Sequence, residues 1–228
     1  MIDLPLAEET ADWAEQPVYE KPQRAFVSVI GNETGLTIAN RGLPEVAVHP
    51  AGDNGIEIAL TLLRCVGWLS RDDLSCRQGP AGPQIPTPAA QCHGEHHFVY
   101  SVIPHGKDPL PAWQAAWATQ TDLQARTTGI HRGPLPPTGS LVYADNPQFV
   151  VSAVKAPEHG SGLIIRGYSL SDEPEEVTLH PGYPFDQGEI VRLDETPVGV
   201  AIHPDQDGCF TTSVQPAQIL TVRLFNDQ

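Results

Sequence analysis

An almost uninterrupted apolar run, IEIALTLLRCV over residues 56–66, constrains the fold more than any other stretch of the chain. The run is too short to cross a membrane, and it follows the turn sequence GDNG at residues 52–55 without a helix cap. A short apolar run that is bounded by turn signals and rich in leucine and β-branched residues is typical of a strand buried on both faces. The sequence therefore predicts a buried strand here, in which Cys65 packs as a small apolar side chain.

A polar loop follows this run directly. It contains Arg71, the adjacent carboxylates Asp72 and Asp73, and Arg77, and it continues into the two Gly-Pro pairs within residues 79–83. Functional residues tend to lie on loops that a rigid scaffold holds in place. If the chain has a site of its own, the sequence predicts it in this loop.

Two interpretations of the loop remain open. Asp72 and Asp73 could act as the acid and the base of glycoside hydrolysis, but that chemistry needs about 5–9 Å between two carboxyl groups with the substrate in the gap. Adjacent residues in one loop rarely hold that geometry. In the other interpretation, Arg–Asp pairs hold the loop together, Asp72 caps the following turn, and a guanidinium is fixed towards a neighbouring domain.

The rest of the chain consists of short apolar runs separated by turns, with 23 Pro and 20 Gly among 228 residues. This pattern favours an all-β sandwich architecture over a helical bundle. One helix is predicted over residues 112–126, where Trp113, Ala116 and Trp117 recur at helical spacing. The tryptophan pair is either a hydrophobic stripe packed on a sheet or a platform for a sugar ring.

Composition and spacing divide the chain into three parts. Residues 1–23 are polar and acidic, and they are interpreted as an arm or linker without a targeting signal. Residues 24–140 form a first β-rich part, which ends in a linker-like connection over residues 127–140. Residues 141–228 hold short strand-like runs at a spacing of roughly 8–15 residues, which is typical of an immunoglobulin-like sandwich.

The charge of the chain excludes some classes of partner. The formal net charge is −15 at pH 7. Acidity of this size argues against nucleic acid and against an anionic membrane surface as partners. The sequence shows neither a signal peptide nor a transmembrane run, so we expect a cytoplasmic protein.

The densest set of potential metal ligands is CHGEHH at residues 92–97. On a strand, His93, Glu95 and His97 would point to one face but would be spread along about 13 Å, which is too far for one ion without a bulge. Cys, His and Glu all bind zinc, so a metal site on these three residues stays open beside a simpler interpretation. In the simpler interpretation, the segment is the polar beginning of a strand over residues 96–103 that ends at Pro104.

Several consecutive blocks of the sequence point to a known family. The blocks are GLTIANRGLPEVAV (35–48), IALTLLRCVGWLSRDDL (58–74), residues 81–105, residues 150–168, and RLDE…QPAQILTVRL within residues 192–224. Together they resemble the C-terminal region of glycoside hydrolase family 38, the α-mannosidases, in its bacterial, mannosylglycerate-hydrolase-like branch. The resemblance covers about residues 24–225 in the order that this family uses.

The resemblance implies a fold and a role. Residues 24–140 would form part of a mutarotase-like β super-sandwich, and residues 141–228 would form a small terminal β-sandwich. In this family, the zinc ligands and the nucleophilic aspartate lie in an N-terminal α/β barrel, and none of those motifs has a counterpart here. The resemblance therefore implies a chain that is inactive alone and has no cofactor of its own. Its partners would be a zinc-dependent catalytic barrel and a mannose-containing glycan or mannoside.

One set of site residues follows from the resemblance. In the family, an Arg-rich strand end and an Asp-Asp loop approach the active site of the barrel from the C-terminal region. The corresponding stretch covers residues 64–73, and it makes Arg64, Arg71, Asp72 and Asp73 candidates to face the substrate. Whether Arg64 or Arg71 faces the sugar is left open, and no catalytic or metal-binding residue transfers.

Two further expectations concern binding. A free-standing carbohydrate-binding module is the rival class, with its stacking platform drawn from Trp68, Trp113, Trp117 or Tyr183. A strand edge that is left unpaired would also be prone to association with another chain. The sequence therefore predicts that a homodimer covers such an edge.

Overall fold

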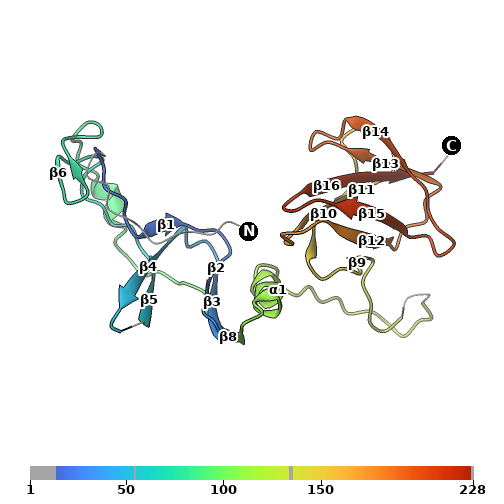
Figure 1. Ribbon diagram of the computed structural model, residues 1–228, viewed down its shortest axis with the longest axis horizontal. Helices are drawn as coiled ribbons and strands as arrows, with labels where there is room; N and C mark the ends of the chain where they lie inside the picture. The colour runs from blue at the N-terminus through green and yellow to red at the C-terminus, as the bar shows by residue number, and fades with distance from the viewer. Residues whose placement is uncertain (1–13, 54, 134–135, 227–228) are drawn as a thin grey trace. The chain divides into compact units, whose positions relative to one another are not determined.

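The computed structural model describes residues 14–53, 55–133 and 136–226. Its contacts divide the chain into two compact units, Ile2–Thr127 and Thr128–Gln228. The architecture is all-β, as predicted, and the described residues contain one α-helix (Figure 1). The division falls at the start of the predicted connection over residues 127–140. Most of the predicted N-terminal arm, residues 1–13, lies outside the described residues.

The N-terminal unit contains two small antiparallel sheets. In both sheets the middle strand pairs with a strand on each side, and each outer strand has one edge that no described strand pairs with. A two-stranded hairpin and a short 3₁₀ helix follow within the loop that leaves the first sheet. The first sheet has the order β1-β4-β5, and the second has the order β2-β3-β8. The elements are β1 (Glu20–Pro22), β2 (Phe26–Ile30), β3 (Thr34–Asn40), β4 (Glu45–Ala51), β5 (Gly55–Leu60), β6 (Asp73–Leu74), β7 (Arg77–Gln78), η1 (Pro88–Gln91) and β8 (Tyr100–Gly106).

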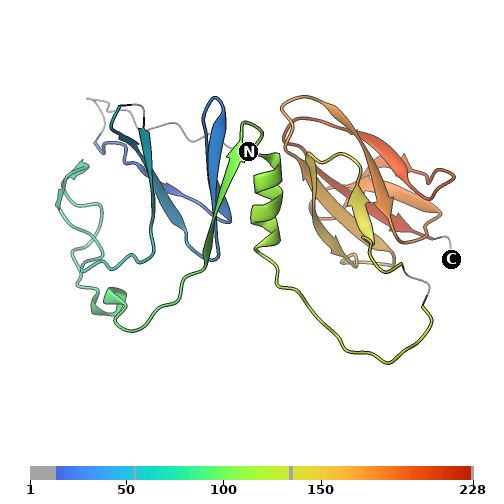
Figure 2. The same cartoon turned by 90° about the horizontal axis from the view of Figure 1, so that it is seen from below.

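Helix α1 (Leu110–Ala118) packs against strands β3 and β8 (Figure 2). Trp113 is buried, and its indole N–H donates a hydrogen bond of 2.8 Å to Ser28 Oγ. Phe26 lies beside both tryptophans of the helix, with ring centroids 6.4 Å from Trp113 and 6.0 Å from Trp117. The helix is shorter than predicted, and its tryptophans form a stripe that packs on a sheet.

The C-terminal unit is a two-sheet β-sandwich, as predicted. One sheet has the order β10-β11-β16-β13-β14 and the other has the order β15-β12-β9, and both are antiparallel. Apolar side chains from the two sheets form one core, in which Val177 and Leu179 of β12 meet Val222 and Leu224 of β16. The strands are β9 (Val142–Ala144), β10 (Phe149–Lys155), β11 (Leu163–Ser169), β12 (Glu175–Pro181), β13 (Gln187–Val191), β14 (Pro197–Ile202), β15 (Phe210–Val214) and β16 (Ile219–Phe225).

The apolar run over residues 56–66 differs from its prediction. Strand β5 ends at Leu60, and the residues that follow are not in a strand. Leu62 is 44% exposed and Val66 is 49% exposed, while Cys65 is an exposed thiol. The prediction of a strand buried on both faces is therefore wrong for this chain. Among the described strands β5 pairs only with β4, and the exposed apolar side chains show that no described residue covers the faces that the pattern would bury.

The strand predicted over residues 96–103 is shifted towards the C-terminus. Strand β8 begins at Tyr100 and continues through Pro104 and His105 to Gly106. Pro104 does not end the strand, because β8 lies at the edge of its sheet and, among the described strands, pairs only with β3. An edge strand tolerates a proline where the missing N–H would point away from the ladder.

Candidate functional site

Two backbone hydrogen bonds join the beginning and the end of the loop between residues 67 and 87. The N–H of Leu69 donates to the carbonyl of Ile85 (2.9 Å), and the N–H of Thr87 donates to the carbonyl of Gly67 (2.9 Å). Ser70 Oγ accepts hydrogen bonds from the N–H groups of Ala81 (3.2 Å) and Gly82 (3.1 Å). A hydroxyl that accepts two backbone N–H groups fixes the Gly-Pro segment against the other side of the loop.

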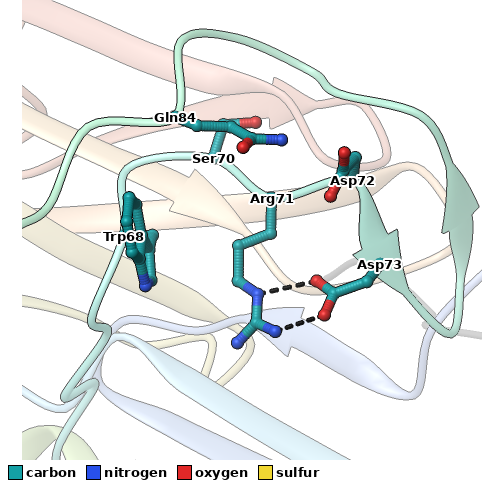
Figure 3. A pocket seen from close by; sticks show the side chains of 6 residues that line it. All are labelled: Trp68, Ser70, Arg71, Asp72, Asp73 and Gln84. Carbon is teal, nitrogen blue, oxygen red and sulfur yellow. Dashed lines mark hydrogen bonds and ion pairs between the residues drawn. The ribbon is translucent and has the colours of Figure 1, made fainter.

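A pocket of about 250 Å³ lies in this loop. Arg71 and Asp73 form a two-pronged ion pair on one side of it, in which Arg71 Nε donates to Asp73 Oδ1 at 2.7 Å and Arg71 Nη2 donates to Asp73 Oδ2 (Figure 3). Asp72 makes no hydrogen bond to a described residue, and its carboxylate lies apart from that pair in Figure 3. The pocket is lined by Trp68, Ser70, Arg71, Asp72, Asp73 and Gln84.

The ion pair favours the charged forms of both of its members. The hydrogen bond from Arg71 holds the pKa of Asp73 below its ordinary value, and the same bond with Asp73 raises the pKa of Arg71. Both groups are therefore charged at neutral pH. With Asp72, the pocket carries one positive and two negative groups.

The structure distinguishes the two interpretations of this loop. Both carboxylate oxygens of Asp73 accept hydrogen bonds from Arg71, which stabilises the ionised form of Asp73. An ionised carboxylate that is held in this way cannot act as a general acid near neutral pH. The geometry therefore favours a loop that is held by an Arg–Asp pair over an acid–base dyad.

The four substrate-facing candidates do not come together as a group. Arg71, Asp72 and Asp73 line the pocket. Arg64 does not line it, and its Nε lies 3.6 Å from Glu45 Oε2. The pocket also includes Ser70 and Gln84, which no sequence pattern marked. Gln84 comes from the opposite side of the loop, and only the two backbone hydrogen bonds between the ends of the loop bring it close.

The histidine-rich segment does not assemble a metal centre. His97 Nε2 lies 3.1 Å from Glu95 Oε1, and His96 Nε2 lies 2.6 Å from the carbonyl oxygen of Cys92. Across residues 14–53, 55–133 and 136–226, no three His, Cys, Asp or Glu side chains are placed to hold an ion. His93 does not join the Glu95–His97 pair, so the described residues do not fit a zinc ion.

A second pocket, of about 160 Å³, lies in the C-terminal unit. Its wall contains a buried Cys209, whose Sγ lies 3.0 Å from His180 Nδ1, and the ring of Tyr143 stacks on His180 at 4.3 Å. Burial, together with the nearby Asp205 and Asp207, raises the pKa of Cys209. A thiol with a raised pKa stays neutral and is a poor nucleophile.

No helix within the described part of the chain is both long and apolar enough to cross a membrane.

Comparisons with known proteins identify the family. Residues 148–222 match the model of the glycosyl hydrolases family 38 C-terminal beta sandwich domain. The α-mannosidase from Enterococcus faecalis V583 is 32% identical, with a TM-score of 0.70 over 94% of this chain and 22% of that one. The chain corresponds to the C-terminal β-sandwich region of glycoside hydrolase family 38. The resemblance that the sequence blocks indicated is thereby confirmed.

Two further relatives agree with this family. A glycosyl hydrolase family 38 protein from Enterococcus faecalis is 31% identical, with a TM-score of 0.68, over 90% of this chain and 22% of that one. A protein of Halalkalibacterium halodurans named "Putative mannosylglycerate hydrolase" is 31% identical over 167 residues, which are 72% of this chain and 17% of that protein. The chain therefore spans about a fifth of the length of these family 38 relatives.

Proposed function

We propose that this chain serves as the C-terminal β-sandwich region of an α-mannosidase-type glycoside hydrolase. In this role it supports a zinc-dependent catalytic barrel and forms part of the cleft that binds a mannose-containing glycan or mannoside. The proposal rests on one observation above all, the match in fold over 94% of the chain to an α-mannosidase of this family.

The loop pocket supplies the chemistry for contact with a sugar. The ring of Trp68 is 45% exposed and can stack on the apolar face of a pyranose. Asp72 is available to accept hydrogen bonds from sugar hydroxyls, since it makes none to a described residue. Asp73 holds the guanidinium of Arg71 in one orientation, so that its remaining N–H groups are fixed as donors.

The charge of the pocket favours a neutral sugar ring as the group that binds there. One positive and two negative side chains repel an additional carboxylate more than they repel a hydroxyl-bearing ring. Zinc, when bound in a barrel of this family, would act as a Lewis acid on oxygen ligands. The described residues of this chain do not fit that ion, so their part is to bind and orient the glycan.

A chimera tests the proposal. The chain replaces the matched region of the Enterococcus faecalis V583 α-mannosidase, and hydrolysis of an aryl α-mannoside is compared between the chimera and the chain alone. We expect turnover by the chimera and none by the chain. Metal-stimulated turnover by the chain alone would contradict the proposal, as would a folded chimera without activity.

Two variants of the chimera examine the pocket itself. Trp68→Ala and Asp72→Asn should each raise KM by about 3–10-fold, because one hydrogen bond or stacking contact contributes about 1 kcal/mol. Asp172→Asn, an exposed acid in the C-terminal unit, is the matched control and should leave KM unchanged. Equal KM values for all three variants would remove the pocket from the glycan cleft.

A free-standing carbohydrate-binding module is the second candidate, and the exposure of Trp68 is the observation that favours it. The buried Trp113 cannot serve as a platform, and Trp117 and Tyr183 are half-buried, so Trp68 is the most exposed of the four candidate rings. Mannose oligosaccharides should quench the fluorescence of the free chain if this function holds, and Trp68→Phe should abolish the effect. Absence of quenching would reject this candidate.

A further inference from the structure

The segment that continues from β5 exposes large apolar side chains on consecutive residues. Leu62 is 44% exposed, Leu63 is 43% exposed and Val66 is 49% exposed, while Ile56 within β5 is 50% exposed. Successive side chains of an extended segment point in opposite directions, so the exposure of both Leu62 and Leu63 leaves two sides of the segment uncovered. Single exposed apolar residues are ordinary, but a contiguous apolar patch marks an interaction surface.

The backbone N–H groups of residues 62–65 also have no hydrogen-bond acceptor among the described residues, whereas the N–H of Val66 donates to the carbonyl of Arg64 (3.0 Å) and the carbonyl of Val66 accepts from Thr87 Oγ1 (3.0 Å). The N–H of Thr61 still donates to the carbonyl of Glu45 at 3.2 Å, which continues the pairing with β4. Beyond this point, none of the N–H groups of residues 62–65 donates a hydrogen bond to a described residue. β5 itself pairs with β4, and no strand within residues 14–53, 55–133 and 136–226 pairs with its other edge. An apolar edge with free N–H and C=O groups is a template for the addition of another strand.

The sequence pattern and the structure disagree in an informative way at this segment. Residues 56–66 have the composition of a strand buried on both faces, yet none of the residues that the structure describes covers Ile56, Leu62, Leu63 or Val66 well enough to bury it. The solved family 38 structures match this chain over 22% of their own length, so more than three quarters of each lies outside the match. That remaining polypeptide is large enough to bury the exposed apolar side chains of residues 56–66.

The net charge of the chain argues against a second copy of the chain as the partner that covers residues 56–66. The chain has a net charge of −15, and association of two copies would bring two such charges together. A partner with a less acidic or a basic surface avoids this repulsion. The observations therefore favour a different polypeptide over a homodimer.

We propose that residues 56–66 are a docking strand for the remaining polypeptide of a family 38 enzyme. A strand of that polypeptide pairs with the free edge of β5 and its continuation, and apolar side chains of the partner cover Leu62, Leu63 and Val66. The partner is thus a β-rich surface with an unpaired edge and an apolar strip. This inference rests on the proposed function, since it names the surface through which the chain joins its enzyme.

Hydrogen–deuterium exchange tests the docking strand in the free full-length chain and in the chimera described above. The amides of residues 62–65 should exchange quickly in the free chain. In the chimera they should be protected by about 100-fold or more, as in a paired strand. The amides of residues 121–127, an exposed segment that follows α1, serve as the internal reference and should exchange quickly in both proteins.

A proline substitution provides a second measurement. Leu63→Pro removes an N–H that has no partner among the described residues, so the free chain should keep its urea midpoint. In the chimera the same change blocks strand pairing, and it should lower the protection of residues 62–65 by at least about tenfold. Leu123→Pro is the matched control, because Leu123 is fully exposed outside any helix or strand, and it should change neither protein.

The outcomes separate this inference from the proposed function. An active chimera whose residues 62–65 remain unprotected overturns the docking strand and leaves the function in place. A protected but inactive chimera overturns the function alone. A chimera that fails to fold counts against both. Protection of residues 62–65 in the free chain that appears together with dimer formation assigns the segment to a second copy and overturns the proposed partner.

Discussion

The two units of the chain use similar short apolar strands but reach different degrees of burial. In the C-terminal unit, large side chains such as Ile165, Val177 and Leu224 are fully buried between two sheets. In the N-terminal unit, small residues such as Ala39 and Ala116 make up much of the buried apolar set. Many of its large apolar side chains are exposed, among them Leu62, Leu63, Val66, Leu69, Val99, Tyr100 and Val102.

The difference follows from the number of layers that each unit supplies. A sheet buries one face only when another layer covers that face. The C-terminal unit contains both layers of its sandwich, and the sheets share one core. In the N-terminal unit, α1 covers β3 and β8, whereas β5 and its continuation have no cover among the described residues. An apolar strand pattern is thus evidence for a buried surface, but the burying partner can be a different polypeptide.

Truncation of leucine should show the largest difference between the units. Leu179→Ala removes a side chain that is 1% exposed, and it should lower the free energy of unfolding of the C-terminal unit by about 2–5 kcal/mol. Leu69→Ala removes one that is 61% exposed, and its effect should stay within about 0.5 kcal/mol. Urea unfolding by circular dichroism measures both changes.

Tryptophan fluorescence assigns each change to a unit, because all four tryptophans lie at or before residue 117. The fluorescence transition should therefore be insensitive to Leu179→Ala. Equal losses in the free energy of unfolding for Leu179→Ala and Leu69→Ala would contradict the assignment of a closed core to the C-terminal unit alone.

Thiol labelling should show the next largest difference. Cys65 and Cys92 of the N-terminal unit are exposed, whereas Cys209 of the C-terminal unit is buried. At pH 8 an aromatic disulfide reagent should modify Cys209 more slowly than Cys65 by about 100-fold or more, since labelling requires local opening. Comparable rates would show that the wall of the pocket at Cys209 opens readily.

The raised pKa of Cys209 makes the stability of the C-terminal unit depend on pH. Its ordinary value is 9.0, and burial raises it in the folded state. As the pH rises, the thiol of Cys209 therefore loses its proton in the unfolded chain before it does so in the folded chain. The buried, neutral thiol thus contributes to the free energy of unfolding below pH 9, and this contribution declines as the pH rises further. Cys209→Ala should remove this alkaline loss of stability in urea titrations at several pH values. An unchanged pH profile would contradict it.

A smaller effect on stability is expected for the hydrogen bond between Trp113 of α1 and Ser28 of the sheet on which the helix packs. Trp113→Phe keeps most of the buried ring but removes the hydrogen bond to Ser28 Oγ, and it should lower the free energy of unfolding of the N-terminal unit by about 1 kcal/mol. Trp117→Phe, which makes no such bond in the described structure, is the control and should cost less. The remaining tryptophans report the transition by fluorescence.

The smallest global effect is expected at the Arg71–Asp73 pair, because both side chains are more than half exposed. Arg71→Gln should raise the pKa of Asp73 towards its ordinary value of 3.8, since the hydrogen bond from Arg71 holds it lower. The favourable contribution of the pair is present above that value and is lost as the pH falls through the folded pKa. Carboxyl NMR titration measures the shift, and Arg71→Lys should give a smaller rise. An unchanged pKa would show that the pair is absent in solution.

Much of the fold was predictable from local sequence. The strands of the C-terminal unit follow from alternating apolar residues between turns, and helix α1 follows from Trp113, Ala116 and Trp117 at helical spacing. The site was predictable in part, since Arg71, Asp72 and Asp73 do line a pocket. Ser70 and Gln84 were not, because they join that pocket only through the pairing of Leu69 with Ile85 and of Gly67 with Thr87.

The sequence by itself determined the all-β class and the two β-rich parts, because these depend on the local order of apolar residues and turns, and its consecutive blocks of residues carried the resemblance to family 38. Only the tertiary structure decided which apolar strands are buried. It placed Leu224 inside a sandwich and left Leu63 on a surface, although both lie in apolar-rich runs, ILTVRLF (219–225) and IEIALTLLRCV (56–66). Burial depends on a second surface that is distant in sequence or belongs to another polypeptide, and no local pattern specifies whether that surface is present.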